Sequence, residues 1–252
     1  METKTFLAFS CVHVPFESAS ATSWLLDAIK KRRPDVVVCL GDLFDNSPAS
    51  RWPSEHTHDM AEEYQKANLL LERIRKITPD SHHQWLAGNH EDNGLAPNRF
   101  NRRYRDLLDY RLREHIPEYS EWGNTPYRNA PSGLYRLGQV TFCHGYECGA
   151  TSDVRQAVKC CASRPYSLFV CGHTHQPRPV TQCELSNIRL PIWCANPGTL
   201  ASLDPPLDYV YRRDTRKWGA GIVVGETALT KSERQGIMWE AEVLIHRMAW
   251  DV

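Results

Sequence analysis

The sequence predicts an α/β fold built from two mixed β-sheets with helices packed against them. In the N-terminal part, short apolar runs alternate with segments of helical periodicity, which is the pattern of a parallel sheet with covering helices. In the remainder, short strands follow one another between polar or Pro/Gly turns. We therefore expect a mixed α/β sandwich in which the C-terminal part builds most of the second sheet.

The N-terminal elements alternate in type. The clearest helix is the second, where apolar residues recur at steps of four and three from Met60 to Ile74. The expected order is a strand at Thr5–Ser10, a helix at Ser20–Arg33, a strand at Asp35–Leu40, a helix at His58–Ile77 and a strand at His82–Ala87.

The second half changes character. Gly138 separates two apolar runs, Leu134–Leu137 and Val140–His144, as in a hairpin, and Asp153–Ala162 has helical periodicity. A long exposed loop is expected over residues 204–218, and no linker divides the chain, so we expect a single domain over residues 1–252. Further strands are predicted at Tyr166–Cys171, Val180–Leu185, Asn187–Ala195, Gly221–Gly225 and Trp239–His246.

Composition excludes several classes of protein. The chain has 252 residues, of which 41% are hydrophobic, and 30 Lys and Arg balance 30 Asp and Glu. These values exclude a disordered chain or a polycation, and bulk charge gives no support to a nucleic-acid partner. The nine cysteines lack zinc-finger or CxxC spacing, as expected for free, buried thiols in a reducing compartment. With no signal-peptide pattern and no run of 18 apolar residues, we expect a cytoplasmic protein without a membrane segment.

Five polar clusters follow predicted strands, and all consist of metal-ligand residue types. In an open α/β sheet the carboxyl ends of the strands face one crevice, so residues distant in sequence converge there. Any one cluster alone is ordinary turn or buried polar sequence, but five in order are improbable by chance. The donors suit two borderline-soft divalent ions held close together. The clusters are Cys11-Val12-His13, Gly41-Asp42-Leu43-Phe44-Asp45, Gly88-Asn89-His90-Glu91-Asp92, His144-Gly145 and Gly172-His173-Thr174-His175.

These residues resemble the motifs of the calcineurin-like metallophosphoesterases, which read D-x-H, GD-x-x-D, GNH[ED], H and GH-x-H in that order. Four of the five blocks match at every defining position, and with Asn196-Pro197-Gly198 the resemblance extends from about Thr5 to Leu200. It implies a four-layer αββα sandwich and a dinuclear metal site that hydrolyses phosphate esters.

The resemblance also assigns roles by position. It implies one divalent ion held by Cys11, His13, Asp42 and His175, and a second held by Asp42, Asn89, His144 and His173. Asp42 would bridge the ions, which would activate a water near neutral pH. His90 would act as general acid on the leaving oxygen with Asp45 orienting its ring, while Glu91 and Asp92 would steady the third loop.

Cys11 departs from the family pattern, which has Asp at this place. A thiolate carries the same charge but is softer and cannot bind through two oxygens, with bonds of about 2.3 Å to zinc. Ligation by Cys11 would favour zinc or iron over manganese. The alternative is a weak or empty first site.

The sequence leaves the class of phosphate ester open. Ser/Thr protein phosphatases of this superfamily carry Arg after the second Asp, where this chain has Asn46, which argues against a protein phosphatase. A phosphodiesterase acting on a small molecule or nucleotide is favoured. The alternatives are a nuclease, for which the arginine-rich segment Arg99–Arg113 could hold a nucleic-acid backbone, and a catalytically impaired binding module. That segment also fits a solvated amphipathic helix, and the sequence does not specify an oligomeric state.

Overall fold

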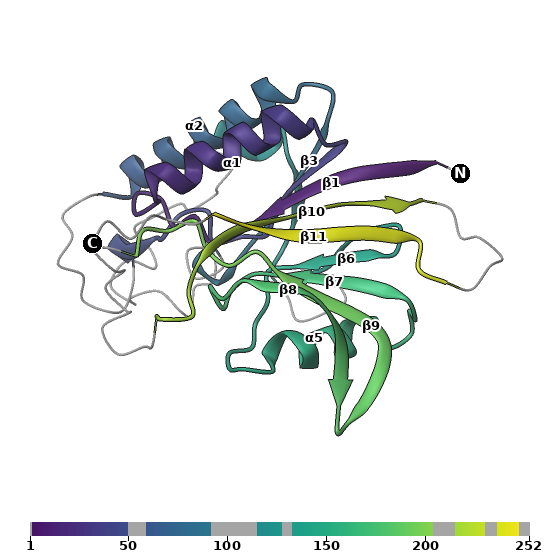
Figure 1. The fold of residues 1–252 in the computed structure, drawn as a ribbon. Coiled ribbons are helices and arrows are strands. Elements are labelled where there is room, and N and C mark those ends of the chain that lie inside the picture. Colours follow the sequence, from purple (N-terminus) through teal and green to yellow (C-terminus); the bar gives the residue numbers. More distant parts are fainter. Residues whose placement is uncertain are drawn as a thin grey trace.

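The structure is a computed structural model that describes residues 2–49, 59–91, 115–127, 133–203, 215–229 and 236–246. Two mixed β-sheets pack face to face in this part of the chain, and helices cover both outer faces (Figure 1). The predicted helix at Arg99–Arg113 and most of the predicted loop at residues 204–218 lie outside the described residues.

The first sheet has six strands in the order β11-β10-β1-β2-β3-β4. Strands β1 to β4 are parallel to one another, whereas β10 is antiparallel to β1 and β11 is antiparallel to β10. The bounds are β1 Thr3–Phe9, β2 Val36–Cys39, β3 His82–Leu86, β4 Gly123–Thr125, β10 Ala220–Ala228 and β11 Trp239–His246.

The second sheet has five strands in the order β5-β6-β7-β9-β8. Its three central strands β6, β7 and β9 are parallel, and antiparallel strands close both edges. The bounds are β5 Tyr135–Leu137, β6 Val140–Cys143, β7 Ser167–Cys171, β8 Arg178–Leu185 and β9 Ile188–Asn196.

The expectation that the C-terminal part builds the second sheet is wrong for its last two strands. Strand β10 pairs with β1, from Thr3 opposite Ala228 to Ala8 opposite Val223. Its side chains alternate between the two cores: Ile222 and Val224 face the helices, while Val223 faces the second sheet. The open edge of β1 presents unpaired backbone groups that β10 satisfies, and the apolar pattern of a strand does not specify its partner.

Helices α1 (Ala19–Arg32) and α2 (Met60–Ile77) lie side by side over the first sheet (Figure 1). Each begins at a capping residue: Ser18 accepts from the backbone N–H of Ala21, and Asp59 accepts from that of Glu62. Helix α5 (Ser152–Cys161) covers the outer face of the second sheet. Two short 3-10 helices, η1 (Ser47–Ala49) and η2 (Pro117–Ser120), lie after β2 and before β4 respectively.

The central core lies between the two sheets. Phe6 of β1 and Phe142 of β6 meet edge to face, with ring centroids 5.3 Å apart, and Val38 and Val170 belong to the same buried cluster. The order of layers is therefore helices, sheet, sheet and helix, which confirms the predicted αββα sandwich.

The state of the cysteines and the hydropathy of the helices bear on where the chain can fold. All nine cysteines are free, and all except Cys148 are buried. Within the described ranges, none of the helices combines the length and apolar character needed to cross a membrane.

Candidate metal centre and active site

The five polar clusters converge at one edge of the sandwich. Three follow the carboxyl ends of β1, β2 and β3 in the first sheet, and two follow β6 and β7 in the second. Because these strands are parallel within each sheet, their following loops emerge on the same side. The structure thereby brings together the seven predicted ligands with Asp45, His90 and Glu91.

Backbone hydrogen bonds join these loops to one another. The N–H of Cys11 donates to Gly41 O at 2.9 Å, and that of His13 donates to Asp42 O at 3.0 Å, so the first two loops continue the pairing of β1 and β2. The carbonyl of Cys11 accepts from the hydroxyl of Thr199 at 2.7 Å and from the N–H of Leu200 at 3.0 Å. The segment after Asn196-Pro197-Gly198 thus fixes the first loop from the side of the second sheet.

Most of the predicted ligands have left-handed backbone conformations. Such conformations cost about 1–3 kcal/mol for a residue with a side chain, and they persist where the surrounding structure enforces them. Their concentration in three loops indicates that the loops are shaped to aim these side chains inward. The φ angles are 54° at Cys11, 53° at His13, 50° at Asp42, 68° at His173 and 60° at His175.

Gly88 is required by the close approach of the second and third loops. A Cβ at this position would lie 2.2 Å from Oδ1 of Asp42 and 2.5 Å from its backbone nitrogen. Any side chain there would displace Asp42, the residue shared by both predicted ion sites. Steric crowding therefore explains why the Gly-Asn-His-Glu block begins with glycine.

Glu91 holds the second and third loops together. Its carboxylate is fully buried and accepts from the backbone N–H groups of Asp42 at 2.9 Å, Leu43 at 2.7 Å and Gly88 at 2.6 Å. Burial, followed by the negative charge of Asp42, raises the pKa of Glu91 to about 7. The contacts agree with the expectation that Glu91 steadies this loop, whereas Asp92 lies outside the described residues.

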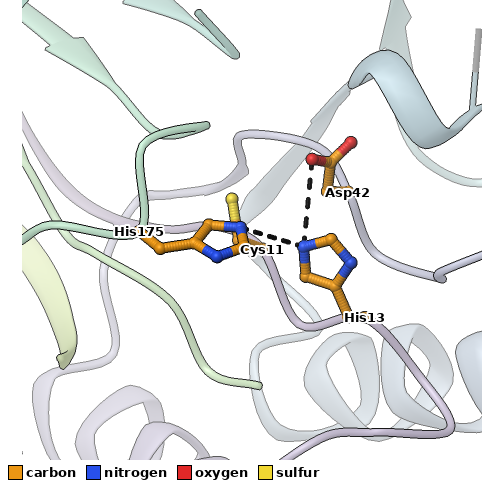
Figure 2. A group of neighbouring side chains, drawn as sticks. All are labelled: Cys11, His13, Asp42 and His175. Atoms are coloured by element: carbon orange, nitrogen blue, oxygen red, sulfur yellow. Dashed lines mark hydrogen bonds and ion pairs between the residues drawn. The ribbon is translucent and has the colours of Figure 1, made fainter. Parts of the chain in front are cut away.

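The first group of candidate ligands consists of Cys11, His13, Asp42 and His175, whose ligand atoms all lie within 4.8 Å of one another. In Figure 2 the side chains converge, and Nε2 of His13 faces both His175 and Asp42. It lies 3.1 Å from His175 Nε2 and 3.9 Å from Asp42 Oδ2. All four residues are buried.

The second group consists of Asp42, His144 and His173. Nε2 of His144 lies 3.1 Å from Asp42 Oδ2 and 3.1 Å from Asn89 Oδ1, so the predicted amide ligand belongs to the same cluster. Asp42 is common to both groups, which is the arrangement required of a bridging carboxylate.

The hydrogen bonds of two histidines leave lone pairs directed into these clusters. Nδ1 of His144 donates to Leu40 O at 2.7 Å, and Nδ1 of His13 lies 2.9 Å from Asp45 Oδ1, which can only accept when ionised. Their Nε2 atoms therefore face the carboxylate, amide oxygen and imidazole of the clusters. A divalent ion among these atoms would be held by several acceptors at once, and such ions fit this donor set.

His175 supports the same conclusion. Its Nδ1 is buried and has no hydrogen-bond partner among the described residues. If Nε2 carried the proton, Nδ1 would keep a buried lone pair without a donor; if Nδ1 carried it, that donor would be unsatisfied. Burial, and then the neighbouring His13, hold the pKa of His175 well below its usual value, so the ring is neutral and able to bind a metal.

Burial and neighbouring charges shift the pKa values of Asp42, His144 and Cys11. Burial opposes the ionisation of Asp42, but His144 and then His90 outweigh it and hold the pKa of Asp42 well below its usual range. Burial likewise opposes the charge of His144, yet Asp42 raises its pKa. Burial and then Asp42 raise the pKa of the Cys11 thiol well above its ordinary value. A metal at Cys11 would therefore displace a proton from the thiol.

His90 is held by the loop that contains Asp45. Its Nδ1 donates to the backbone carbonyl of Asp45 and lies 3.5 Å from the carboxylate Oδ1 of the same residue. Because a carbonyl only accepts, Nδ1 of His90 carries a proton, and Nε2 is the ring nitrogen that this bond does not use. Burial lowers the pKa of His90, but Asp42 and then Asp45 raise it to about 9. The Asp45 carboxylate itself contacts His13 more closely than His90.

Two side chains that lie outside the motif blocks also contact predicted ligands. Trp218 packs edge to face on His175, with ring centroids 4.2 Å apart. The exposed Cys148 places its Sγ 3.3 Å from His173 Nε2. Trp218 falls in the stretch expected to be an exposed loop, and Cys148 follows the lone His144-Gly145 block, so neither position had a periodicity that marked it.

Residues 4–177 match the family model of the calcineurin-like phosphoesterases, and the chain belongs to this family. None of the curated proteins compared with the sequence matches it.

Solved structures of similar fold include a phosphoesterase of E. coli, Yfce, with 16% identity and a TM-score of 0.45, covering 90% of this chain and 93% of that chain. Vps29 of Cryptosporidium parvum has 14% identity, a TM-score of 0.42 and 97% coverage of both chains. A Vps29 variant of Entamoeba histolytica has 13% identity, a TM-score of 0.41 and coverage of 96% and 99%. At such low identity these structures show a similar fold, and the activity of this chain must be argued from its own site.

Proposed function

We propose that this protein is a metal-dependent phosphodiesterase that uses two divalent ions and His90 as general acid. The observation that carries the proposal is the pair of candidate ligand groups that share Asp42, in which every residue is buried except the half-buried His173. Cys11, His13, Asp42 and His175 would hold one ion. Asp42, Asn89, His144 and His173 would hold the other. When bound, such ions lower the pKa of water and offset the charge that develops on the phosphoryl oxygens.

His90 has the protonation state that a general acid needs. With a pKa raised to about 9, its imidazole is charged at neutral pH, and the bond from Nδ1 to Asp45 O directs Nε2 away from that loop. Nε2 would give its proton to the leaving oxygen as the ester bond breaks. Asp45 would serve twice, because its carbonyl orients His90 and its carboxylate fixes His13.

The side chain at Asn46 favours a diester over a phosphoprotein substrate. Where a protein phosphatase would have Arg, Asn46 donates its Nδ2 to the carbonyl of His90 at 3.2 Å. The position therefore offers no cation to a phosphate group. A diester carries one negative charge, whereas a monoester carries up to two, so a diester makes the smaller demand on positive charge in the site.

Hydrolysis of aryl esters tests the proposal. Protein stripped of metal with a chelator and reloaded with Mn²⁺, Zn²⁺ or Fe²⁺ should hydrolyse bis(p-nitrophenyl) phosphate at least about tenfold faster than p-nitrophenyl phosphate, since chemistry and charge favour the diester. The stripped protein should be inactive. Absence of turnover with every metal would contradict the proposal and favour a binding module.

The nuclease alternative is separated in the same assay. The arginine-rich segment on which it depends lies outside the described residues. A nuclease would cleave long oligonucleotides faster than dinucleotides, and its binding would weaken steeply as salt rises. A diesterase for small molecules or nucleotides should show neither trend.

The role of Cys11 has its own expected result. Cobalt-loaded wild-type protein should show a near-ultraviolet thiolate-to-metal absorption band, because Cys11 lies among the first candidate ligands. The Cys11→Ser variant should lose this band, and Cys11→Asp should shift metal preference from zinc and iron toward manganese, since oxygen donors are harder.

The matched control is Cys148→Ser, which removes the exposed thiol beside His173. This variant should keep the absorption band. Retention of the band in Cys11→Ser together with its loss in Cys148→Ser would assign the thiolate to the second group and contradict ligation by Cys11.

Two broader assignments are also proposals. A single domain over residues 1–252 is supported by the pairing of the C-terminal strands β10 and β11 with N-terminal β1. A cytoplasmic location is supported by the free state of all nine cysteines.

A further inference from the structure

We infer that Glu63 of helix α2 is a positioning residue for His90, acting through the turn formed by residues 45–47. This inference rests on the proposed role of His90 as general acid. Glu63 belongs to none of the motif blocks, and its side chain is fully buried in the described structure.

The contacts of Glu63 are with the turn that follows Asp45. One carboxylate oxygen, Oε2, accepts from the backbone N–H of Asn46. The other, Oε1, accepts from the backbone N–H and the hydroxyl of Ser47, both at 3.2 Å. Two successive backbone donors therefore end on the two oxygens of one side chain.

The conformation of the turn explains why a carboxylate is needed. Asn46 has a φ of 59°, in the left-handed region, so the N–H groups of Asn46 and Ser47 reach the same acceptor group. A carboxylate offers two acceptor oxygens, whereas a glutamine amide offers one and would turn N–H groups toward a backbone donor. On its other side the turn is fixed by the N–H of Asp45, which donates to Val14 O at 3.0 Å.

The same turn holds His90 at two points. The carbonyl of Asp45 accepts from the His90 ring, and Nδ2 of Asn46 donates to the His90 backbone carbonyl at 3.2 Å. Residues on both sides of the bond between Asp45 and Asn46 thus contact His90, and Glu63 fixes the second of them directly. Displacement of this turn would move the imidazole away from its geometry, and small misplacements of catalytic groups cost much rate.

The burial of Glu63 argues against an incidental contact. Glu63 lies one helical turn before Ala67, which packs in the core between α2 and the first sheet. Burying a carboxylate is costly unless hydrogen bonds compensate it, and a neutral residue would suit this helix face better. Burial, and then the charge of Asp45, raise the pKa of Glu63 to about 8 although the donors of Asn46 and Ser47 lower it, so the ionised carboxylate predominates above about pH 8. The hydrogen bonds donated by Asn46 and Ser47 offset part of the cost of burying Glu63 on this helix.

The test compares Glu63→Gln with Glu62→Gln across a series of aryl phosphodiesters whose leaving phenols have increasing pKa. Glu62 is the matched control, because it lies next to Glu63 on the same helix, and its carboxylate pairs with Lys66 at 2.9 Å on the surface. Glu63→Gln should lower kcat by about tenfold or more for the poorest leaving group, by less than about threefold for p-nitrophenolate, and leave KM within about twofold. Glu62→Gln should behave like wild type.

A purely structural role would give another pattern. Equal loss of kcat for all leaving groups, or a lower Tm with unchanged kinetics, would overturn the inference. Should Glu63→Gln fail to fold, Ser47→Ala removes one donor to Glu63 and should show the same dependence on the leaving group with smaller amplitude; its absence would overturn the inference equally.

The His90→Asn variant in the same series separates the two proposals. If His90→Asn shows no dependence on the leaving group, the general-acid role itself fails. If His90→Asn shows the dependence and neither Glu63→Gln nor Ser47→Ala does, the proposed function stands and the inference about Glu63 alone fails.

Discussion

Replacing Asp42 with Asn should leave the protein folded but unable to hold two divalent ions. Asp42 is 2% exposed and belongs to both candidate ligand groups, so its charge is the common element of the site. Asparagine keeps the size of the side chain and an oxygen for the N–H of His90, which now donates to Asp42 Oδ1 at 3.0 Å. We expect kcat to fall about a thousandfold or more, because metal ions contribute several kcal/mol to such reactions.

Metal content and thermal unfolding check this expectation. Ions that bind only the folded protein raise Tm, so a chelator should lower the Tm of wild type and leave that of Asp42→Asn nearly unchanged. Glu118→Gln is the control. Its buried carboxylate is bonded by Arg75 through two contacts of 2.8 Å, and its loss should affect stability without changing metal content. Two bound ions and near-normal kcat in Asp42→Asn would exclude a bridging role.

Replacing His90 with Asn should slow hydrolysis without loss of metal. Nδ1 of His90 is bound to the carbonyl of Asp45, so Nε2 is the nitrogen that would protonate the leaving group. General acid catalysis contributes about a hundredfold to ten-thousandfold, so kcat should fall within that range for esters with poor leaving groups. For p-nitrophenyl esters the loss should be much smaller, because that leaving group needs little protonation.

The pH dependence follows from the raised pKa of His90. The charged form predominates below about pH 9, so catalysis that needs it should decline as pH rises through that value. Ions at Asp42 would offset part of the negative charge that raises this pKa, which places the alkaline limb at or below pH 9. His90→Asn should lack this limb.

The stability of the metal-free protein should also decrease as pH rises through the pKa of His90. Since the folded pKa lies above the ordinary value of 6.5, the contribution of His90 to stability is complete below pH 6.5 and is lost as pH rises toward about 9. Unfolding midpoints of wild type and His90→Asn should therefore converge over this interval. Loss of bound metal in His90→Asn would instead identify His90 as a ligand, in line with its nearness to His13 and Asp45.

Local sequence patterns predicted most elements of the fold. The predicted strand at Trp239–His246 coincides with β11, and the predicted helices at Ser20–Arg33 and Asp153–Ala162 differ from α1 and α5 by one residue at each end. Periodicity and capping residues act over a few residues, so they are visible without a tertiary structure. Strand β4 (Gly123–Thr125) was missed, because three polar or small residues form no apolar run.

The candidate site was predicted for a different reason. Its members are polar residues placed directly after strands, and the geometry of parallel strands gathers such positions at one edge. The blocks therefore predicted Cys11, Asp42, His90 and the other members of the candidate site. The convergence of these residues followed from the positions of the strand ends. No motif predicted that the side-chain carboxylate of Asp45 would contact His13 while its backbone carbonyl binds His90.

Glu63 illustrates what local patterns leave hidden. Its spacing from Ala67, Leu70 and Ile74 places it on the buried side of α2, and a charged residue among such positions was the available signal. Nothing in that spacing identifies the donors, because Asn46 and Ser47 belong to another loop whose approach depends on the packing of α2 against the first sheet.

The sequence alone determined which residues have side chains capable of binding a metal, in which order they follow the strands, and that helices alternate with strands in the N-terminal part of the chain. Tertiary structure decided that β10 and β11 join the first sheet, which ring nitrogens of His13 and His144 face the other candidate ligands, and that Glu63 of α2 contacts the turn beside His90. Residue type and short-range periodicity are properties of neighbours along the chain. Strand partners, tautomers and buried hydrogen bonds are selected by groups that meet only when the whole core has packed.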